Sequence, residues 1–409
     1  MLVRIPVEQL RVGMYIHELC GSWYDHPFWR SAFLLDNSED LQDILSTGIK
    51  EVWIDTGKGL DVENGKAERT VAAEIDGALA QANANRQITR HVDITREAVR
   101  AVKICSQSRK AVSSMFQEAR MGKALNASDA LPIVEEISTS VMRNPGALIS
   151  LARLKDKDNY TYMHSVAVCA LMIALARQLG LNNEQTRQAG LAGMLHDIGK
   201  TFIPLEIINK PGKLTAAEFQ TMKNHPVEGR KILLGSNGIS DIALHVCLQH
   251  HEKVDGSGYP DKLTNEQISL YGKMSAVCDV YDAITSIRAY KNGWEPAEAI
   301  RKMAEWSHGH FDQRIFEAFV RSIGIYPIGS MVRLSSDRLG VVIEQTDQSL
   351  PTPRVKVFFS IKSGARTPPE ILDLSKPSCM EKIVSHEDPE KWKISNIQEL
   401  WSDIAAAPW

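Results

Sequence analysis

The spacing of apolar residues changes twice along the chain. Up to about residue 55, short runs of β character such as "MYI" and "EVWID" are interrupted by "SEDLQDILSTG". This polar stretch predicts a helix with Ser38 as its N-cap and Gly48 at its C-terminal end. From about residue 70 to residue 325, apolar residues mostly recur at intervals of three and four, which predicts a succession of helices. After "YPIG" the pattern predicts strands again.

These changes predict a multidomain protein with four parts. A small α/β module is followed by a linker with amphipathic helices, an all-α domain and a small β-rich extension. The limits expected are residues 1–60, 61–128, 129–325 and 326–409. Residues 56–69 are polar and contain glycine, so they are interpreted as the linker proper.

Several helices in this pattern have identifiable ends or faces. Thr215 precedes Glu218 by three residues, which predicts a capping box. Pro296 lies where a first helical turn tolerates proline. The helix predicted from "ITREAVRAVKICSQSRKAV" onward is amphipathic. It can either pack within the chain or pair with a second copy of the chain. The apolar helix around residues 166–179 contains Arg177 and Gln178 and is expected to be buried rather than transmembrane.

Composition narrows the class of protein. The 409 residues are 44% hydrophobic and 24% charged, as in ordinary globular domains. The net charge of −3 gives no overall basic field, so a nucleic acid polymer is not an expected partner. The six cysteines are scattered without a CxxC pair, and the N-terminus lacks the apolar core of a signal peptide. A reducing cytoplasm, away from the membrane, is therefore the expected location.

The helical region contains a set of residues suited to metal binding. Five histidines and two aspartates belong to this set, and they lie within "MHS", "LHDIGK", "NHPVEG", "HHEKVDGSGYP" and "VCDVYDA". Imidazole and carboxylate ligands together suit iron, manganese or zinc. Seven ligands exceed the needs of one tetrahedral zinc and suit two metals that share a carboxylate. Such a pair can hold a water as hydroxide and clamp a phosphate for in-line displacement.

Each residue of this set has a simpler interpretation when taken alone. A lone histidine among apolar residues is more often a core residue than a ligand, and an adjacent His-Asp pair is a weak signal. It is the combination within one predicted domain that favours a metal site. His245 lies ahead of the His-His pair without a matching partner, and we assign it to packing or to the surface.

The order and spacing of these motifs resemble the HD superfamily of metal-dependent phosphohydrolases, and more closely its HD-GYP subfamily. The resemblance covers about residues 135–325 and rests on "HDIGK", "NHPVEG" and "HHEKVDGSGYP". It implies a bacterial phosphodiesterase that hydrolyses cyclic di-GMP to pGpG, to GMP or to both. The cofactors it implies are two divalent transition-metal ions, with iron first and manganese or zinc as alternatives.

The resemblance also implies a role for individual residues. One metal is expected on His164, His196, Asp197 and Asp279, and the second on His225, His250 and His251 with Asp197 as the bridge. Lys200 matches the lysine near the scissile phosphate, so Lys200 and Asp197 are the catalytic candidates. The substrate-binding candidates are Gly258, Tyr259 and Pro260 of the GYP signature, together with the basic residues Arg288 and Lys291.

One position departs from part of the family. Some members have a glutamate one turn before the first histidine, where it helps to bind a third metal. Tyr160 occupies that position here, and a phenol is a poor substitute for a carboxylate at neutral pH. We therefore expect two metals rather than three.

Two other functions remain open at this point. The substrate could be 3′,3′-cyclic GMP-AMP, since nothing in the sequence separates guanine from adenine recognition. A module that senses a cyclic dinucleotide without hydrolysing it is the other alternative, although all seven metal ligands are present. Beyond the cyclic dinucleotide, a second copy of the chain or a signalling protein is left open as a partner.

Overall fold

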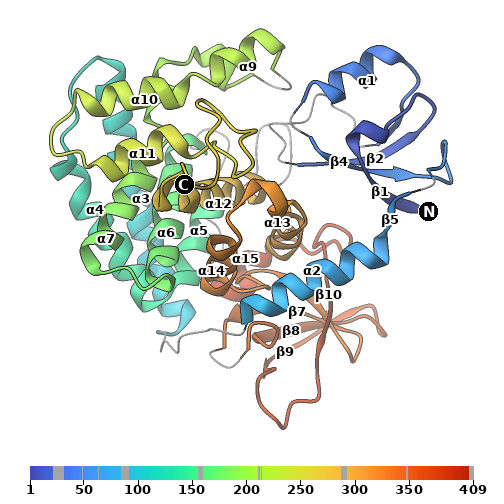
Figure 1. The fold of residues 1–409 in the computed structure, drawn as a ribbon. Coiled ribbons are helices and arrows are strands. Elements are labelled where there is room, and N and C mark those ends of the chain that lie inside the picture. Colours follow the sequence, from blue (N-terminus) through green and yellow to red (C-terminus); the bar gives the residue numbers. More distant parts are fainter. Residues whose placement is uncertain are drawn as a thin grey trace.

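The computed structural model describes residues 1–21, 32–47, 49–62, 64–83, 92–154, 160–210, 212, 214–286, 293–346 and 349–404. Three structural parts are visible in Figure 1: an N-terminal sheet, a helical body and a C-terminal sheet. This arrangement confirms the predicted fold class. The predicted domain limits at residues 60, 128 and 325 stay predictions.

The N-terminal sheet has five strands in the order β3-β2-β4-β1-β5, and its neighbouring strands are antiparallel. Alternate side chains of these strands, including Ile5, Ile16 and Val52, pack with Ile44 of the helix at residues 38–45. The elements are β1 (Leu2–Pro6), β2 (Tyr15–Cys20), β3 (Phe33–Leu34), α1 (Ser38–Leu45), β4 (Glu51–Asp55) and β5 (Lys66–Ala67).

Two sequence predictions in this region were wrong in detail. The N-cap of α1 is Asn37, whose side chain accepts a hydrogen bond from the Asp40 N–H at 2.7 Å, and not Ser38. The predicted linker contains β5, which pairs with β1 at the edge of the sheet. A two-residue edge strand leaves almost no periodic signal, so the polar composition concealed it. Gly48 lies outside the described residues.

The helical body is built around α6 (Tyr160–Gln178), whose side chains from Met163 to Ala176 are all buried. The surrounding elements supply the metal-site motifs and the helices that pack on them. They are α2 (Glu68–Asn83), α3 (Ile94–Arg120), α4 (Ala127–Arg143), α5 (Pro145–Arg153), α7 (Asn183–Leu195), η3 (Ile198–Phe202), α8 (Leu205–Ile208), α9 (Ala216–Met222), α10 (His225–Leu234), α11 (Asp241–Gln249), α12 (Leu270–Thr285), α13 (Pro296–His310) and α14 (Gln313–Ile323).

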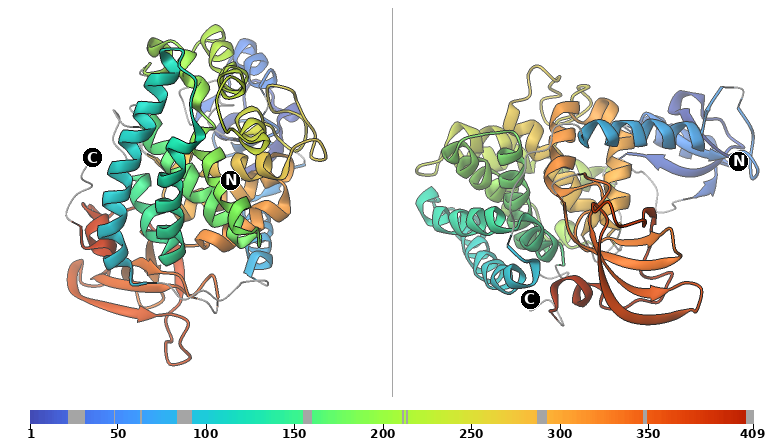
Figure 2. Two further views of the ribbon diagram at one scale, coloured as in Figure 1. Left: turned by 90° about the vertical axis from the view of Figure 1, so that its left-hand side faces the viewer. Right: turned by 90° about the horizontal axis from the view of Figure 1, so that it is seen from below.

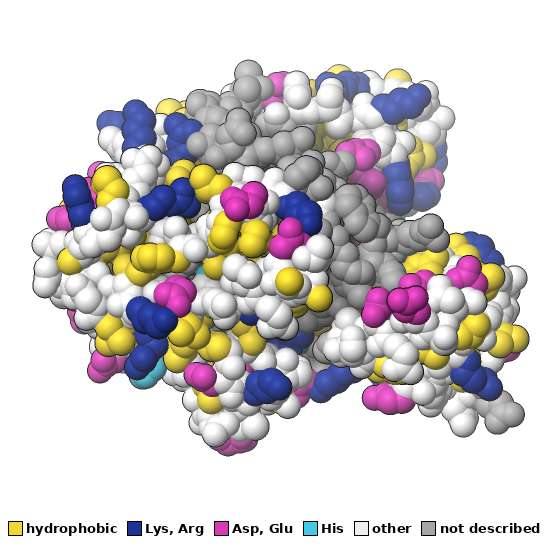
Figure 3. All heavy atoms as spheres, turned by 90° about the horizontal axis from the view of Figure 1, so that it is seen from above, with side chains coloured by type: hydrophobic (Ala, Val, Ile, Leu, Met, Phe, Trp, Pro, Cys, Tyr) yellow, Lys and Arg dark blue, Asp and Glu magenta, His cyan; other side chains and the backbone are white. Residues whose placement is uncertain are grey.

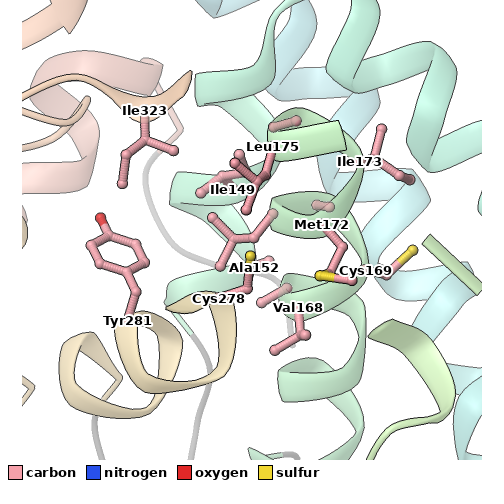
Figure 4. Close-up of a cluster of buried hydrophobic side chains, with 14 of the residues drawn as sticks. Ile149, Ala152, Val168, Cys169, Met172, Ile173, Leu175, Cys278, Tyr281 and Ile323 are labelled. Atoms are coloured by element: carbon pink, nitrogen blue, oxygen red, sulfur yellow. The ribbon is translucent and has the colours of Figure 1, made fainter. Parts of the chain in front are cut away.

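The core of the body explains why α6 is apolar on every side. Figure 4 shows Val168, Met172 and Leu175 of α6 facing side chains from neighbouring helices, among them Cys278 and Tyr281 of α12. A helix enclosed in this way needs no polar face. Within the described residues, no helix is long and apolar enough to cross a membrane.

The amphipathic helix α3 packs within its own chain. Its apolar face, which includes Ala101, Cys105 and Phe116, is buried, and α3 contacts α4, α5 and α6. Figure 2 shows α3 and α4 side by side along the body. The intrachain interpretation of this helix is therefore confirmed. The capping box of Thr215 and Glu218 is also present.

The C-terminal sheet has the strand order β10-β6-β7-β8-β9 and lies against the lower end of the body (Figure 2). Its strands are β6 (Met331–Leu334), β7 (Arg338–Glu344), β8 (Arg354–Ser360), β9 (Ala365–Asp373) and β10 (Ile383–His386). The sequence predicted the first three. Pro368 and Pro369 obscured β9, which tolerates them because it is an edge strand. The short helix α15 (Ile397–Ser402) follows, with its Trp401 buried.

Charges of both signs are mixed on the surface. On the face seen in Figure 3, lysine and arginine side chains are interspersed with aspartate and glutamate. This mixture agrees with the small net charge of −3.

An ion pair between the buried Glu97 and the partly exposed Arg143 joins α3 to α4 and generates a stability prediction. Glu97 is fully buried and accepts hydrogen bonds from Arg143 Nε at 2.7 Å, Arg143 Nη2 at 2.8 Å and Ser140 Oγ at 2.7 Å. Arg143→Ala leaves this carboxylate without its main cation. We expect the free energy of unfolding to fall by about 3–5 kcal/mol, measured by urea denaturation.

Arg100 is the matched control, because it pairs with the same carboxylate at 3.4 Å but is mostly exposed. Arg100→Ala should lower the free energy of unfolding by less than about 1 kcal/mol, because exposed ion pairs contribute little to stability. Equal losses for the two variants would show that burial of Glu97 does not decide the effect.

Candidate metal centre

The seven predicted ligands come together in the middle of the helical body. They lie on or next to five helices, α6, α7, α10, α11 and α12, and almost all are fully buried. Two lie in mid-helix, and the other five lie at helix ends, where the backbone can aim neighbouring side chains at one point. The positions are His164 on α6, His196 and Asp197 after α7, His225 at the start of α10, His250 and His251 after α11, and Asp279 on α12.

Their ligand atoms form groups of metal-binding size. His164, His196 and Asp279 offer atoms within 4.8 Å of one another, and so do His225, His250 and His251. In the first group, His164 Nε2 lies 3.0 Å from Asp279 Oδ1. In the second, the Nε2 atoms of His225 and His250 are 3.1 Å apart.

Asp197 lies between the two groups and turns one oxygen toward each. Its Oδ2 is 3.5 Å from His164 Nε2 and 3.4 Å from His196 Nε2. Its Oδ1 is 3.3 Å from His225 Nε2 and 3.7 Å from His250 Nε2. A carboxylate in this position can bridge two ions.

Three buried atoms at the centre show that the residues fit metal ions. His196 Nε2, Asp197 Oδ1 and Asp279 Oδ2 have no partner of hydrogen-bond geometry within the described part of the chain. A buried polar atom without a hydrogen-bond partner lowers the stability of the fold, so these atoms are expected to bind a further partner. Nitrogen and oxygen donors converging in this way suit a divalent first-row ion.

The far side of four of the five imidazoles is fixed by a hydrogen bond to the protein. For four histidines the Nδ1 atom is engaged, which leaves Nε2 directed at the cluster and sets the tautomer. The partners are Asp282 Oδ2 for His164 at 2.6 Å, Gly193 O for His196 at 2.7 Å, Met222 O for His225 at 2.8 Å and Cys247 O for His250 at 2.9 Å.

Asp282 was missed by the sequence reasoning. It is buried and lies one helical turn after Asp279, so both carboxylates of "DVYDA" face His164 from α12. The spacing of three residues was the available signal, because positions i and i+3 share a helix face.

The charges of the cluster are set by its burial and by one another. Burial alone would raise the pKa of Asp197, but Lys200, His196 and His225 hold this pKa well below its usual value. Burial and the nearby imidazoles lower the pKa of His250 to about 3. At neutral pH the carboxylate is therefore ionised and His250 is neutral, as metal ligands must be.

Lys200 reaches the cluster from η3. Its ammonium group forms an ion pair with Asp197 Oδ2, and the lysine side chain is mostly buried. The preceding Gly199 packs against α10, where a Cβ atom would lie only 1.9 Å from His225 O. Only glycine permits this contact, so it holds Lys200 and His225 on neighbouring backbones.

The segment from His250 to Pro260 forms a compact turn, which we call the GYP turn. The ring of Tyr259 stacks on His251 with centroids 4.7 Å apart, and the Tyr259 N–H donates to His251 O at 3.2 Å. Gly258 packs so closely that a Cβ atom would lie 2.4 Å from Lys253 N. The turn therefore fixes Tyr259 beside the cluster.

Glu252 and Asp255 order the GYP turn instead of joining the cluster. The buried Glu252 carboxylate accepts hydrogen bonds from the N–H groups of Asp261 at 2.7 Å and Leu263 at 3.0 Å. Asp255 Oδ1 accepts from the Ser257 N–H at 2.8 Å. Both carboxylates therefore make contacts that order the loop.

Other predicted positions divide into two classes. His245 is exposed on α11, as expected of a surface residue. Arg288 and Lys291 lie outside the described residues, as does the side chain of Tyr160. The predicted roles of these three residues stay predictions.

Comparison with known proteins adds to this geometry. Residues 2–130 match the family "Domain of unknown function (DUF3391)", and residues 144–315 match the family "HD domain". The chain is 53% identical over 406 residues to the cyclic di-GMP phosphodiesterase PA4108 of Pseudomonas aeruginosa, covering 99% of this chain and 97% of that protein.

Shorter matches cover the helical region. The chain is 43% identical over 148 residues to the cyclic di-GMP phosphodiesterase response regulator RpfG of Xanthomonas campestris, covering 36% of this chain and 39% of that protein. It is 37% identical over 167 residues to 3′3′-cGAMP-specific phosphodiesterase 1 of Vibrio cholerae, covering 41% and 38%. The near full-length match to PA4108 and the HD-domain match confirm the resemblance found in the sequence. The chain belongs to the HD-GYP family of HD-domain phosphodiesterases.

Proposed function

We propose that this protein is a metal-dependent phosphodiesterase that hydrolyses cyclic di-GMP to pGpG, to GMP or to both. The observation that carries the proposal is the position of Asp197, which turns one oxygen toward each of two histidine groups. Similarity to PA4108 over 99% of the chain supports the substrate. The match to the cyclic GMP-AMP enzyme covers 41% of the chain, so cyclic di-GMP is favoured.

The residues of the centre have distinct roles in this proposal. His164, His196 and Asp279 would hold one ion, and His225, His250 and His251 would hold the other. Asp197 would be the ligand shared by the two sites. Bound ions supply a nucleophile from water at neutral pH and offset negative charge on the phosphate.

Lys200 lies beside the bridge and brings a positive charge toward the phosphate. Charge fixed in a buried site favours the transition state, in which negative charge develops on the phosphate oxygens. Tyr259, held by its stack on His251, forms a wall of the substrate site together with Gly258 and Pro260. Arg288 and Lys291 are proposed to bind the phosphates of the dinucleotide.

Removal of the adjacent His196 and Asp197 tests the reaction. The double variant His196→Ala/Asp197→Ala loses a ligand of the first group and the bridge. We expect hydrolysis of cyclic di-GMP to fall by at least about a thousandfold, since residues that act as a unit give losses of this size. Product formation is followed by chromatography, and far-ultraviolet circular dichroism should show unchanged helicity.

His245→Ala is the matched control, because this histidine is exposed on α11, the helix that precedes His250. It should retain full activity. Residual cleavage by the double variant would show that the site is misassigned. Parallel assays with 3′,3′-cyclic GMP-AMP decide the substrate, and a higher kcat/KM for that compound would overturn the choice of cyclic di-GMP.

The metal content tests the number of ions. We propose two ions per chain, with iron as the main metal, because Tyr160 replaces the carboxylate that supports a third ion in some members. Protein purified without oxygen should contain two metal ions per chain by elemental analysis. A content of three would contradict the proposal, and manganese or zinc in place of iron would correct the identity alone.

Asp282 generates a prediction about metal affinity. Asp282→Asn keeps the shape of the side chain but removes the negative charge that supports His164 through its 2.6 Å hydrogen bond. We expect metal affinity to fall by about 10–100-fold, as found when such supporting groups are replaced. Equilibrium dialysis with Mn²⁺ measures the change. Asp241→Asn, at an exposed site on α11, should bind as the unaltered protein does.

A further inference from the structure

Side chains of α13 connect the N-terminal sheet to the helical body, and one of them is the buried carboxylate of Glu305. Glu305 Oε1 accepts hydrogen bonds from Trp53 Nε1 at 2.6 Å and from Arg4 Nη1 at 3.4 Å. Lys302, one turn earlier on α13, donates to Glu18 of β2 at 2.6 Å. These contacts fix the sheet relative to α13.

The C-terminal end of α13 in turn supports the GYP turn. The Asp255 N–H donates to Gly309 O at 3.2 Å, and the Val254 N–H donates to His310 O at 3.3 Å. Asp255 also organises the turn internally, since its Oδ1 accepts from Ser257 Oγ at 2.6 Å and from the Ser257 N–H. The position of Asp255 therefore governs the residues that lead to Gly258.

Lys50, the residue that precedes β4 of the N-terminal sheet, meets this same carboxylate. Its ammonium group forms an ion pair with Asp255 Oδ2, across 205 positions of sequence. Its backbone oxygen accepts a hydrogen bond from the Val7 N–H at 2.8 Å, which ties Lys50 to the sheet. A Cβ atom on Gly309 would lie 3.0 Å from Asp255 Oδ2 and 3.4 Å from Lys50 Nζ, so three separate segments meet here.

We propose that Lys50 is a positioning residue for the substrate site and acts through Asp255 on the GYP turn. The N-terminal sheet and α13 hold Asp255 from two sides, and Asp255 sets the path of the chain into Gly258 and Tyr259. In Figure 1 the connection between α11 and α12 lies between the helical body and the N-terminal sheet, as this role requires. The kinetic readout of this inference rests on the phosphodiesterase activity proposed above.

Charge reversal at Lys50 tests the proposal in the full-length protein. Lys50→Glu places two carboxylates together. Loss of an exposed ion pair changes an equilibrium constant by up to about fivefold, and repulsion between the two carboxylates adds an effect of similar size. We expect KM for cyclic di-GMP to rise by about three- to tenfold, with kcat and metal content unchanged. Lys50→Arg should restore the unaltered KM, because it keeps the ion pair.

Hydrogen exchange gives a readout that needs no catalysis. In Lys50→Glu, amides of residues 252–265 should exchange at least about threefold faster than in the unaltered protein. Lys58→Glu is the matched control, because Lys58 is as exposed as Lys50 and pairs only with Asp55 of its own sheet among the ion pairs of the described residues. It should change neither KM nor exchange in the turn.

The two readouts separate this inference from the proposed function. Absence of hydrolysis by the unaltered protein would overturn the function, while exchange in residues 252–265 would still decide the role of Lys50. Equal KM and equal exchange in Lys50→Glu and Lys58→Glu would overturn the positioning role. A loss of metal or of kcat in Lys50→Glu would overturn it too, by showing that Lys50 acts on the metal centre instead of on the substrate turn.

Discussion

The burial of the Asp197 carboxylate imposes the main constraint on this structure. A negative charge removed from water must be offset by nearby positive charge or by metal ions. Lys200 supplies one such charge directly, and His164, His196, His225 and His250 approach the same carboxylate from different helices. The helices must therefore converge on one point, and their apolar packing has to hold them there.

Close backbone contacts make this convergence possible. Gly199 touches His225 O and Gly229 N, so η3 and α10 approach more closely than any side chain would allow. Gly193 of α7 packs on Val168 of α6 in a similar way, with a hypothetical Cβ at 3.1 Å from Val168 O. The glycines of "AGLAGMLHDIGK" thus bring the backbones of these elements together around the ligands. The motif encodes the distances between elements as well as the ligands.

The sequence predicted most of the centre because its information is local. Adjacent pairs such as His196–Asp197 and His250–His251, combined with helix periodicity, placed ligands on helices of one part of the chain. The resemblance supplied the grouping into two sites. Asp282 was not predicted because a carboxylate that supports a histidine has no motif of its own. β5 and β9 were not predicted because one has only two residues and the other contains prolines, so neither shows a clear alternation of apolar and polar residues.

Contacts between distant segments could not be predicted at all from one sequence. Nothing near Lys50 or Glu305 indicates that either residue faces another part of the chain, because the pairing depends on how the two parts pack. The structure shows why the GYP turn needs such contacts. Residues 250–260 lie outside helices and strands, so the turn has little regular backbone hydrogen bonding to hold it.

Two carboxylates hold this turn in place from opposite sides. Glu252 is buried and accepts hydrogen bonds from the N–H groups of Asp261 and Leu263 on the inner side of the loop. Asp255 faces α13 and the N-terminal sheet and draws the outer part of the turn toward them. The inner contact belongs to the helical body alone, whereas the outer one depends on the N-terminal sheet. A shift of that sheet would therefore reach Tyr259 through Asp255, while His164, His196, His225 and His250 are held in place through their Nδ1 atoms by Asp282 and backbone carbonyl groups.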